Sequence, residues 1–293
     1  MRPPAVSKKL LNLGRNLSRT SRLLFESFVR HSGVKLTTFA KGLSHKEESS
    51  VDWMRSFSSQ RRTRDMENIK TCGARTTADE VLADLDLTGK TILVTGCNSG
   101  IGFVTIRALA ARGAHIIGLA RSLQSAREAC HNAGGSATPV ACDLADITSV
   151  VSEVDIVSSL GRTLDAIITN AGVMCPKKLV IRYGVELQFF VNHIAHFLLV
   201  NRLFGLVPTR TGRIVIVSSS ASVDQAPKEG IMFDNLDGHR FYKPFQFYGQ
   251  SKLANALFAK ELSRRVERRG IAVNSLHPGA VGGTSLQPAW DFT

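Results

Sequence analysis

The sequence TILVTGCNSGIG, at residues 91–102, is the strongest indication of the fold class. The β-rich run TILV leads directly into a glycine-rich turn at residues 95–102, and a helical pattern follows at once. Glycines let the backbone turn tightly, and the N-terminus of a helix offers unpaired N–H groups and a positive dipole end to an anion. The segment therefore predicts either a site for the pyrophosphate of a dinucleotide or an ordinary tight connection between a strand and a helix.

Short β-rich runs alternate with helical stretches along the rest of the chain. The runs lie at residues 91–94, 115–120, 138–142, 165–169, 213–218 and 271–276, and helical patterns are clearest at 184–204 and 247–266. Strands that are apolar on both faces and separated by helices need a parallel sheet that is covered on both sides. The sequence therefore predicts an α/β fold: a doubly wound, Rossmann-type parallel sheet whose ligand crevice lies at the carboxyl ends of the strands.

The net charge of +13 is concentrated near the N-terminus. Residues 1–75 carry 16 Lys and Arg against 6 Asp and Glu, whereas residues 76–293 carry 21 against 18. The larger part of the chain therefore lacks the basic surface that nucleic acids need, and we expect no nucleic-acid partner. No run approaches the roughly 18 consecutive apolar residues of a membrane span, so no transmembrane segment is expected. The five cysteines include no Cys-x-x-Cys pair and indicate neither a disulfide framework nor a zinc site.

Residues 1–75 are predicted to be a basic N-terminal extension, separate from a domain at residues 76–293. Residues 8–30 place leucines and phenylalanines on one face of a helix and arginines on the opposite face. This composition fits an organelle transit peptide, which would make the protein mitochondrial, and it also fits a membrane-surface helix. A disordered leader on a cytoplasmic protein is the third interpretation. Translation from Met1 and from Met66 both stay open, because every recognisable motif follows Met66.

The chain from about Leu85 to Gly279 resembles the short-chain dehydrogenase/reductase family. The glycine spacing is G-x-x-x-G-x-G, and the other matching motifs, in the order of the family, are Asp143-Leu144, Asn170-Ala171-Gly172, Tyr248-x-x-x-Lys252 and Pro278-Gly279. The resemblance implies that Asp143-Leu144 contacts the adenine and that Asn170-Ala171-Gly172 steadies the sheet beside the cofactor. It also implies that the Tyr248 and Lys252 pair carries the proton and that Pro278-Gly279 flanks the nicotinamide. The cofactor-binding residues that it implies are Gly96, Asn98, Ser99, Gly100, Ile101, Gly102, Arg121, Asp143, Leu144, Asn170, Ala171, Gly172, Tyr248, Lys252, Pro278 and Gly279.

The spacing of Tyr248 and Lys252 suggests acid–base chemistry independently of the family resemblance. Residues four apart share one face of a helix, so the lysine ammonium lies beside the phenol. A neighbouring positive charge favours the phenolate and is expected to lower the tyrosine pKa from its usual value near about 10. A phenol tuned in this way can exchange a proton with a carbonyl oxygen. Taken alone, the pair also fits an interfacial tyrosine and a lysine that reaches from a buried stem to water.

Ser219 and Asn192 complete the catalytic set that the resemblance implies. Ser219 directly follows the run RIVIVS, and its hydroxyl is expected to donate a hydrogen bond to the substrate carbonyl. Ser218 and Ser220 flank it and are competing assignments. Asn192 matches the asparagine that holds a water for proton relay in the family, and a hydrogen bond between helices is its other possible role.

His193 and His196 lie about one helical turn apart, as two metal ligands would. No third ligand is in register with them. We therefore interpret both as packed histidines and expect no metal site.

The end of the second strand bears on the choice of cofactor. An acidic residue there would bind the ribose hydroxyls of NAD, but the sequence reads GLARS at residues 118–122. Arg121 can pair with a 2′-phosphate, which predicts NADP. Because Asn98 and Ser99 add no second basic group, NAD stays possible.

Several further segments resemble the retinol dehydrogenase-like and WW-domain oxidoreductase-like branch of the family. They are NSGIGF at 98–103, VNHIAHFLL at 191–199, the long connection between Ser219 and Tyr248, and SKLANALFAKEL at 251–262. The branch implies a small hydrophobic alcohol, aldehyde or ketone as substrate. Aromatic side chains that could line an apolar pocket, or belong to the core, are Phe233, Phe241, Tyr242, Phe245 and Phe247.

Fourteen residues follow Gly279, whereas family members continue through a substrate-covering segment and a last strand. Gly283 stands where the family has threonine, and Thr284 follows it. We therefore expect the final strand to be missing and the substrate to be less well shielded from water.

The leading interpretation is an NADP-dependent oxidoreductase that transfers hydride between the nicotinamide and a carbonyl carbon. The alternative is a catalytically weak or inactive NADP-binding regulatory protein, and an epimerase or dehydratase on the same fold fits less well because no sugar-nucleotide domain follows Gly279. Whether the protein forms a homo-oligomer stays open.

Overall fold

The computed structural model describes residues 72–73, 75–281 and 286. The predicted helix at residues 8–30 lies outside this part, as do Gly283, Thr284 and the region where a last strand would follow. The chain divides into two units, Met1–Ala83 and Asp84–Thr293.

The described part of the first unit contains one short helix, α5 (Ala78–Val81). Thr77 and Glu80 form a capping box at its start: the Thr77 side chain accepts a hydrogen bond from the Glu80 amide, and the Glu80 carboxylate accepts one from the Thr77 amide.

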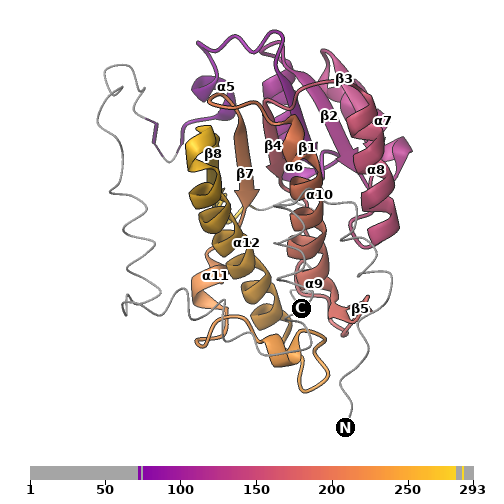
Figure 1. Cartoon of the computed structure of the whole chain (residues 1–293), viewed down its shortest axis with the longest axis vertical. Helices are drawn as coiled ribbons and strands as arrows, with labels where there is room; N and C mark the ends of the chain where they lie inside the picture. Colours follow the sequence, from indigo (N-terminus) through magenta and orange to yellow (C-terminus); the bar gives the residue numbers. More distant parts are fainter. Residues whose placement is uncertain (1–71, 74, 282–285, 287–293) are drawn as a thin grey trace. The chain divides into compact units, whose positions relative to one another are not determined.

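The second unit is built on a six-stranded parallel sheet (Figure 1). Its strands are β1 (Thr91–Thr95), β2 (His115–Ala120), β3 (Ala137–Ala141), β4 (Ala166–Thr169), β7 (Arg213–Val217) and β8 (Ala272–Leu276). Their order is β3-β2-β1-β4-β7-β8, so the direction of winding reverses between β1 and β4. All neighbouring pairs are parallel, which places the carboxyl ends of the six strands at one edge of the sheet. The predicted doubly wound, Rossmann-type fold is confirmed.

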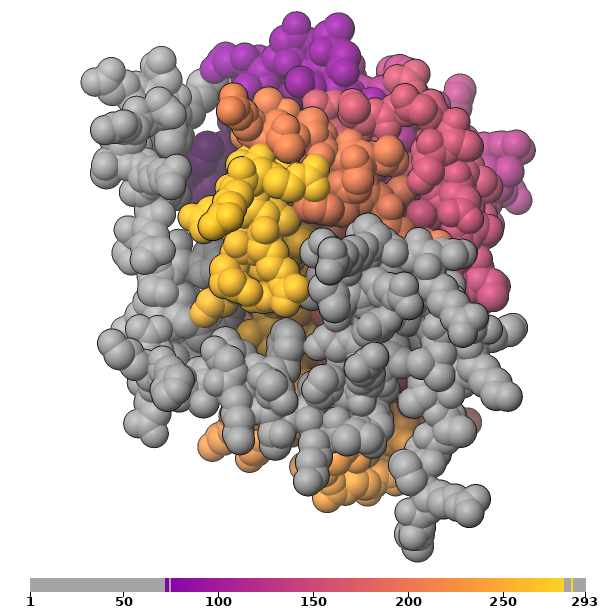
Figure 2. Space-filling model, viewed as in Figure 1, coloured from indigo at the N-terminus to yellow at the C-terminus, as the bar shows by residue number. Residues whose placement is uncertain are grey.

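Helices cover both faces of the sheet. They are α6 (Gly100–Ala110), α7 (Leu123–Ala133), α8 (Ile147–Ser159), α9 (Leu187–Phe189), the π-helical turn η3 (Phe190–Ile194), α10 (Ala195–Leu203), α11 (Ala221–Asp224) and α12 (Pro244–Val266). Right-handed crossovers place α6 and α7 on one face and α8, α10 and α12 on the other. In agreement, α6 packs on α7, and α8 packs on α10. The C-terminal half of α12, in yellow, lies at the surface (Figure 2), and there Lys260 and Arg264 are exposed.

The observed strands agree with the predicted runs to within one residue at each end. The predicted helix at 184–204 is instead composite: it begins with a hairpin of β5 (Ile181–Arg182) and β6 (Val185–Glu186). Tyr183 and Gly184 form the turn with φ angles of 53° and 81°, a conformation that ends helical periodicity. The helical run then passes through α9 and η3 before α10.

The helical run Leu187–Leu206 is long and apolar enough to cross a membrane by length and composition. The sequence predicted a helix here and no transmembrane segment, because polar residues interrupt the apolar ones. Burial inside the protein covers 67% of this window, which is the burial expected of a core helix.

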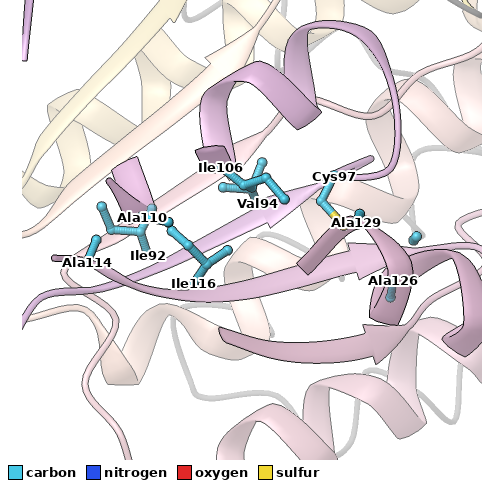
Figure 3. Packing of buried hydrophobic residues seen from close by; sticks show 10 residues of the cluster. Ile92, Val94, Cys97, Ile106, Ala110, Ala114, Ile116, Ala126 and Ala129 are labelled. Carbon is cyan, nitrogen blue, oxygen red and sulfur yellow. The ribbon is translucent and has the colours of Figure 1, made fainter. Parts of the chain in front are cut away.

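A buried apolar cluster fixes β1 and the turn after it against α6 and α7 (Figure 3). Ile92, Val94, Ile106 and Ile116 fill the space between sheet and helices, and each is at most 6% exposed. Complete burial of such a side chain stabilises the fold by about 1.5–3 kcal/mol. The cluster therefore holds the start of the glycine-rich turn in one position.

Candidate active site

The turn between β1 and α6 has room for glycine alone at two positions. Gly96 has a φ of +67°, and a Cβ there would lie 2.9 Å from the Cα of Ala171. At Gly102, a Cβ would lie 2.0 Å from the Gly96 carbonyl oxygen and 2.6 Å from Nδ2 of Asn170. The turn is therefore packed directly against the backbone that follows β4. Its other predicted members are Asn98, which is exposed, and Ser99, Gly100 and Ile101, which are half-buried.

The N-terminus of α6 fits an anionic ligand. Ser99 is its N-cap residue, but the Ser99 side chain accepts no capping hydrogen bond. By contrast, Ser122 and Asp146 cap the N-termini of α7 and α8 with their side chains. The first turn of α6 lies at the switch point of the sheet, where dinucleotides bind in this fold and where a helix N-terminus favours an anion.

The hydroxyl of Thr95 joins β1 to the loop after β4. It accepts hydrogen bonds from the amides of Asn170 and Ala171, both at 3.0 Å. The Asn170 side chain donates in turn to the Thr95 carbonyl oxygen at 3.0 Å. These bonds fix the N-A-G motif against the glycine-rich turn. The motif was predicted from the sequence, but Thr95 was not.

Gly172, the last residue of this motif, connects the turn to the catalytic side chains. A Cβ there would lie 3.1 Å from Oδ1 of Asn192 and 3.6 Å from Nζ of Lys252. The loop therefore approaches both predicted catalytic residues closely.

His196 is a further member of the site that the sequence did not indicate. Its Nε2 lies 2.9 Å from the Thr95 hydroxyl, and its Nδ1 lies 3.0 Å from the carbonyl oxygen of Asn192. The carbonyl can only accept, so Nδ1 carries the proton and Nε2 accepts the Thr95 proton. Burial lowers the His196 pKa to about 4, which keeps the ring neutral at physiological pH. His196 thus links the glycine-rich turn to the π-helical turn that holds Asn192.

The other histidine of the pair, His193, bonds through Nδ1 to Oδ1 of Asn255 at 3.2 Å, and burial lowers its pKa to about 4. The two rings thus make separate hydrogen bonds. Within residues 75–281, no group of three His, Cys, Asp or Glu side chains could hold a metal ion.

Tyr248 lies on α12 and is 5% exposed. Its phenol shares a hydrogen bond with the side chain of Ser219, which follows the end of β7. Ser218 donates its own hydroxyl proton to the carbonyl oxygen of Lys252 at 2.7 Å, and Ser220 is exposed. Of the three competing serines, Ser219 is therefore the one that the fold brings to the tyrosine.

Lys252 lies on the same face of α12, with Nζ 5.7 Å from the centroid of the Tyr248 ring. Nζ donates a hydrogen bond to the Val217 carbonyl oxygen at 3.2 Å. Burial lowers the Lys252 pKa to about 8, and within residues 75–281 no carboxylate pairs with it. Burial likewise raises the pKa of Tyr248, against the effect of its bond to Ser219. The predicted lowering of the tyrosine pKa is therefore wrong for this structure, because desolvation by burial is the largest effect on the phenol.

Asn192 lies in η3, and both its side-chain oxygen and its side-chain nitrogen form hydrogen bonds within the protein. Oδ1 accepts a hydrogen bond from the Val173 amide at 2.8 Å, and Nδ2 donates to the Val173 carbonyl oxygen and to Oγ of Ser251, both at 3.0 Å. The side chain therefore cross-links the loop after β4 to α12, as the second interpretation of this residue had it. Its water-holding role stays a prediction.

The remaining predicted cofactor residues follow the carboxyl ends of other strands. Arg121 comes directly after β2 and is exposed. Asp143 comes after β3, and its Oδ1 accepts a hydrogen bond from the Ala145 amide at 2.9 Å, while Leu144 is buried. Pro278 and Gly279 come after β8, with Gly279 at a φ of +89°. All of them lie at the edge of the sheet that carries the glycine-rich turn.

The aromatic residues before α12 and in its first turns divide into two groups. Phe247 is fully buried, and Tyr242 packs on it with ring centroids 5.2 Å apart. These two rings belong to the core. The exposed members of the set, at 38–42% exposure, are Phe233, Phe241 and Phe245.

The burial of Lys252 leads to a prediction about the free energy of unfolding. Its pKa is about 8 in the folded chain, against 10.5 for a lysine in water. As the pH falls from 10.5 to 8, the unfolded chain takes up a proton that the folded chain does not, so the free energy of unfolding decreases. Below pH 8 the full penalty persists. We expect Lys252→Met to raise the free energy of unfolding at pH 7 by about 2 kcal/mol.

Urea denaturation at pH 7 and at pH 10 checks this prediction. The gain from Lys252→Met should shrink as the pH approaches 10.5. Lys260→Met is the matched control, because Lys260 is exposed on the same helix and should give no gain at either pH. A Lys252→Met chain that is less stable than the parent at pH 7 would contradict the burial argument.

Comparisons with known proteins agree with this geometry. A family model described as short chain dehydrogenase matches residues 90–231. Short-chain dehydrogenase TIC 32 B, chloroplastic, of Brassica napus is 38% identical over 223 residues, 71% of this chain and 69% of that protein. Retinol dehydrogenase 14 of Mus musculus is 39% identical over 211 residues, 66% of this chain and 61% of that protein. The crystal structure of an uncharacterised protein from Mycobacterium paratuberculosis superimposes with a TM-score of 0.60 at 35% identity, covering 68% of this chain and 71% of that one.

Proposed function

Because the chain belongs to the short-chain dehydrogenase/reductase family, in the branch of the retinol dehydrogenases and WW domain-containing oxidoreductases, we propose that it is an NADP-dependent oxidoreductase of small hydrophobic alcohols, aldehydes or ketones. Family membership makes the protein a nicotinamide-dependent dehydrogenase or reductase that acts on CH–OH groups. The preference for NADP, the hydrophobic substrate and the Ser219–Tyr248–Lys252 site are the proposed parts. The observation that carries the proposal is the hydrogen bond between Tyr248 and Ser219, with Lys252 beside the phenol.

The edge of the sheet offers groups for each part of the dinucleotide. The first-turn amides of α6 would hold the pyrophosphate, and the Asp143 carboxylate and the backbone at Leu144 would meet the adenine. Pro278 and Gly279 would flank the nicotinamide. The bound nicotinamide supplies or accepts the hydride.

The residues of α12 and β7 would handle the proton. Its raised pKa keeps the Tyr248 phenol protonated at neutral pH, so it can donate to a carbonyl oxygen that is being reduced. The Ser219 hydroxyl would donate a second hydrogen bond to the same oxygen. With a pKa of about 8, Lys252 is largely charged at pH 7 and would stabilise the phenolate that is left.

His196 and Asn192 would position the elements of the site and not take part in the chemical step. Together with Thr95 they join the glycine-rich turn, the N-A-G loop and α12 through hydrogen bonds of 2.8–3.0 Å. We infer that this buried network holds the cofactor-binding edge and the proton donor at a fixed separation, as hydride transfer requires.

Turnover by the purified full chain tests the proposal. We expect oxidation of NADPH in the presence of apolar aldehydes or ketones, and a rate that rises with the apolar size of the substrate. Tight NADPH binding without turnover of any carbonyl compound in the panel would contradict the proposed function and would favour a dinucleotide-binding regulatory protein.

The position of Arg121 leads to a prediction about the preference for NADPH over NADH. Its exposed guanidinium follows β2, where a 2′-phosphate would lie, and we expect Arg121→Asp to replace attraction with repulsion. A charged hydrogen bond contributes about 1.5–3 kcal/mol, so the ratio of kcat/KM for NADPH to that for NADH should fall by about 10- to 100-fold.

Steady-state kinetics with both cofactors measures this ratio. Arg127→Asp makes the same charge change on α7, where Arg127 is exposed, and should leave the ratio unchanged. Equal ratios in the parent and in Arg121→Asp would refute the assigned role.

A further inference from the structure

Two buried cysteine side chains meet beneath the glycine-rich turn. Cys97 belongs to the turn after β1, and Cys130 lies on α7. They are 0% and 6% exposed, respectively, and their side chains are hydrogen-bonded to each other. Figure 3 shows the Cys97 side chain beside Ala129, the neighbour of Cys130 on α7.

Gly118 of β2 provides the space in which the two sulfurs meet. A Cβ at this position would lie 2.7 Å from Sγ of Cys130 and 3.1 Å from Sγ of Cys97. Both sulfurs therefore lie against the same point of the strand. Of the other cysteines of the described part, Cys72 is exposed, and Cys142 and Cys175 are buried elsewhere in the fold, after β3 and in the loop that follows β4.

We propose that Cys97 and Cys130 form a modification site, at which a small peroxide converts the two thiols into a disulfide between the glycine-rich turn and α7. The chain holds the thiols in contact before any reaction, so little conformational entropy opposes the bond. Peroxide is the suitable class of oxidant because a pair this buried admits only a small molecule.

The two sulfurs would have different roles. Cys130 is the more exposed, and its sulfur accepts hydrogen bonds from the Cys97 thiol and the Gly118 amide, which lower its pKa. The Cys130 thiolate would attack one oxygen of the peroxide; the O–O bond breaks, one oxygen leaves as water, and Cys130 becomes a sulfenic acid. The Cys97 sulfur would then attack the Cys130 sulfur, and the S–O bond would break with loss of a second water. Two thiols lose two electrons, and the peroxide gains them.

The bond would act on the cofactor site, an effect that rests on the proposed function. Cys97 lies in the turn that would bind the pyrophosphate. Its amide donates a hydrogen bond to the Leu119 carbonyl oxygen at 3.1 Å. A disulfide of about 2.05 Å needs the sulfurs to come closer than two unbonded thiols can. The turn and α7 would therefore shift towards each other. Because a misplacement of about 1 Å can cost up to about 10²-fold, we expect the Kd for NADPH to rise on the order of tenfold.

The test uses the full chain with Cys72→Ser and Cys142→Ala. In this parent chain, tryptic peptide 91–107 contains Cys97 as its single cysteine, and peptide 128–162 contains Cys130 as its single cysteine. After treatment with hydrogen peroxide and alkylation of free thiols, mass spectrometry should find the two peptides joined. Dithiothreitol should separate them, and Cys130→Ala in the same background should abolish the link.

Fluorescence titration with NADPH then measures the effect. The peroxide-treated parent chain should bind about tenfold more weakly than the reduced chain. Dithiothreitol should restore its affinity, and the Cys130→Ala chain should bind equally well before and after treatment. Free thiols at both positions after treatment would overturn the inference, whatever the affinity. A complete cross-link with unchanged affinity would overturn the effect on the cofactor site. A reduced chain that does not bind NADPH would instead refute the proposed function, while the cross-link is still judged by mass spectrometry.

Discussion

Tyr248→Phe should lower kcat by about 10²- to 10⁴-fold and leave the affinity for NADPH unchanged. The phenol is the proton donor of the proposed reaction. The ring itself is 5% exposed, so phenylalanine fills the same space without a cavity. The loss should therefore appear in the chemical step, measured by single-turnover kinetics, and not in the free energy of unfolding.

Tyr242→Phe is the matched control for this result. Tyr242 also carries a phenol, half-buried, before α12, but its hydroxyl donates to the Pro176 carbonyl oxygen at 2.9 Å. Removing that bond should cost about 1 kcal/mol of stability and leave kcat within about threefold of the parent. Equal losses of kcat in the two variants would mean that the phenol of Tyr248 has no special role.

Gly102→Ala should weaken NADPH binding by about 10²-fold and lower the free energy of unfolding by about 1–3 kcal/mol. The added Cβ would lie 2.0 Å from the Gly96 carbonyl oxygen, and this atom belongs to the backbone and cannot rotate away. The turn must therefore open or α6 must move, and either change displaces the amides that would bind the pyrophosphate. Isothermal titration with NADPH and urea denaturation measure the two effects.

Gly205→Ala provides the control for adding one methyl group. Gly205 lies in a short 3-10 turn (Phe204–Leu206), and among the described residues nothing lies within 4 Å of a Cβ there. We expect no change in NADPH affinity and less than about 0.5 kcal/mol in stability. A Gly102→Ala chain that binds NADPH as tightly as Gly205→Ala would show that the turn does not hold the dinucleotide.

The strands could be predicted from the sequence because each is an apolar run bounded by a turn, and both faces of the sheet are buried. Residues 115–120, for example, are HIIGLA, and five of these six residues are buried. The hairpin of β5 and β6 could not be predicted, because each strand has two residues and leaves no periodicity. The π-helical turn η3 escaped prediction for a related reason: one extra residue in a turn hardly changes the apolar pattern.

Within the site, the motifs could be located but their hydrogen bonds could not. The sequence places three serines after β7 and does not show that Ser218 donates its hydroxyl proton to the Lys252 carbonyl oxygen. Thr95 and His196 are 101 residues apart, and only the register of β1 against the following helices brings them to 2.9 Å. The pKa of Tyr248 was predicted in the wrong direction because spacing reports the neighbouring charge and not the depth of burial.

The central step of the proposed reaction is hydride transfer to a carbonyl carbon held at Ser219 and Tyr248. NADPH that carries deuterium at both C4 positions of the nicotinamide, incubated with the full chain and an apolar aldehyde, can report this transfer. We expect one deuterium on the carbinol carbon of the alcohol, detected by mass spectrometry, with both label and product absent in Tyr248→Phe over the same time. An alcohol without deuterium, or bound NADPH that transfers no label to any carbonyl compound, would rule out the proposed hydride transfer.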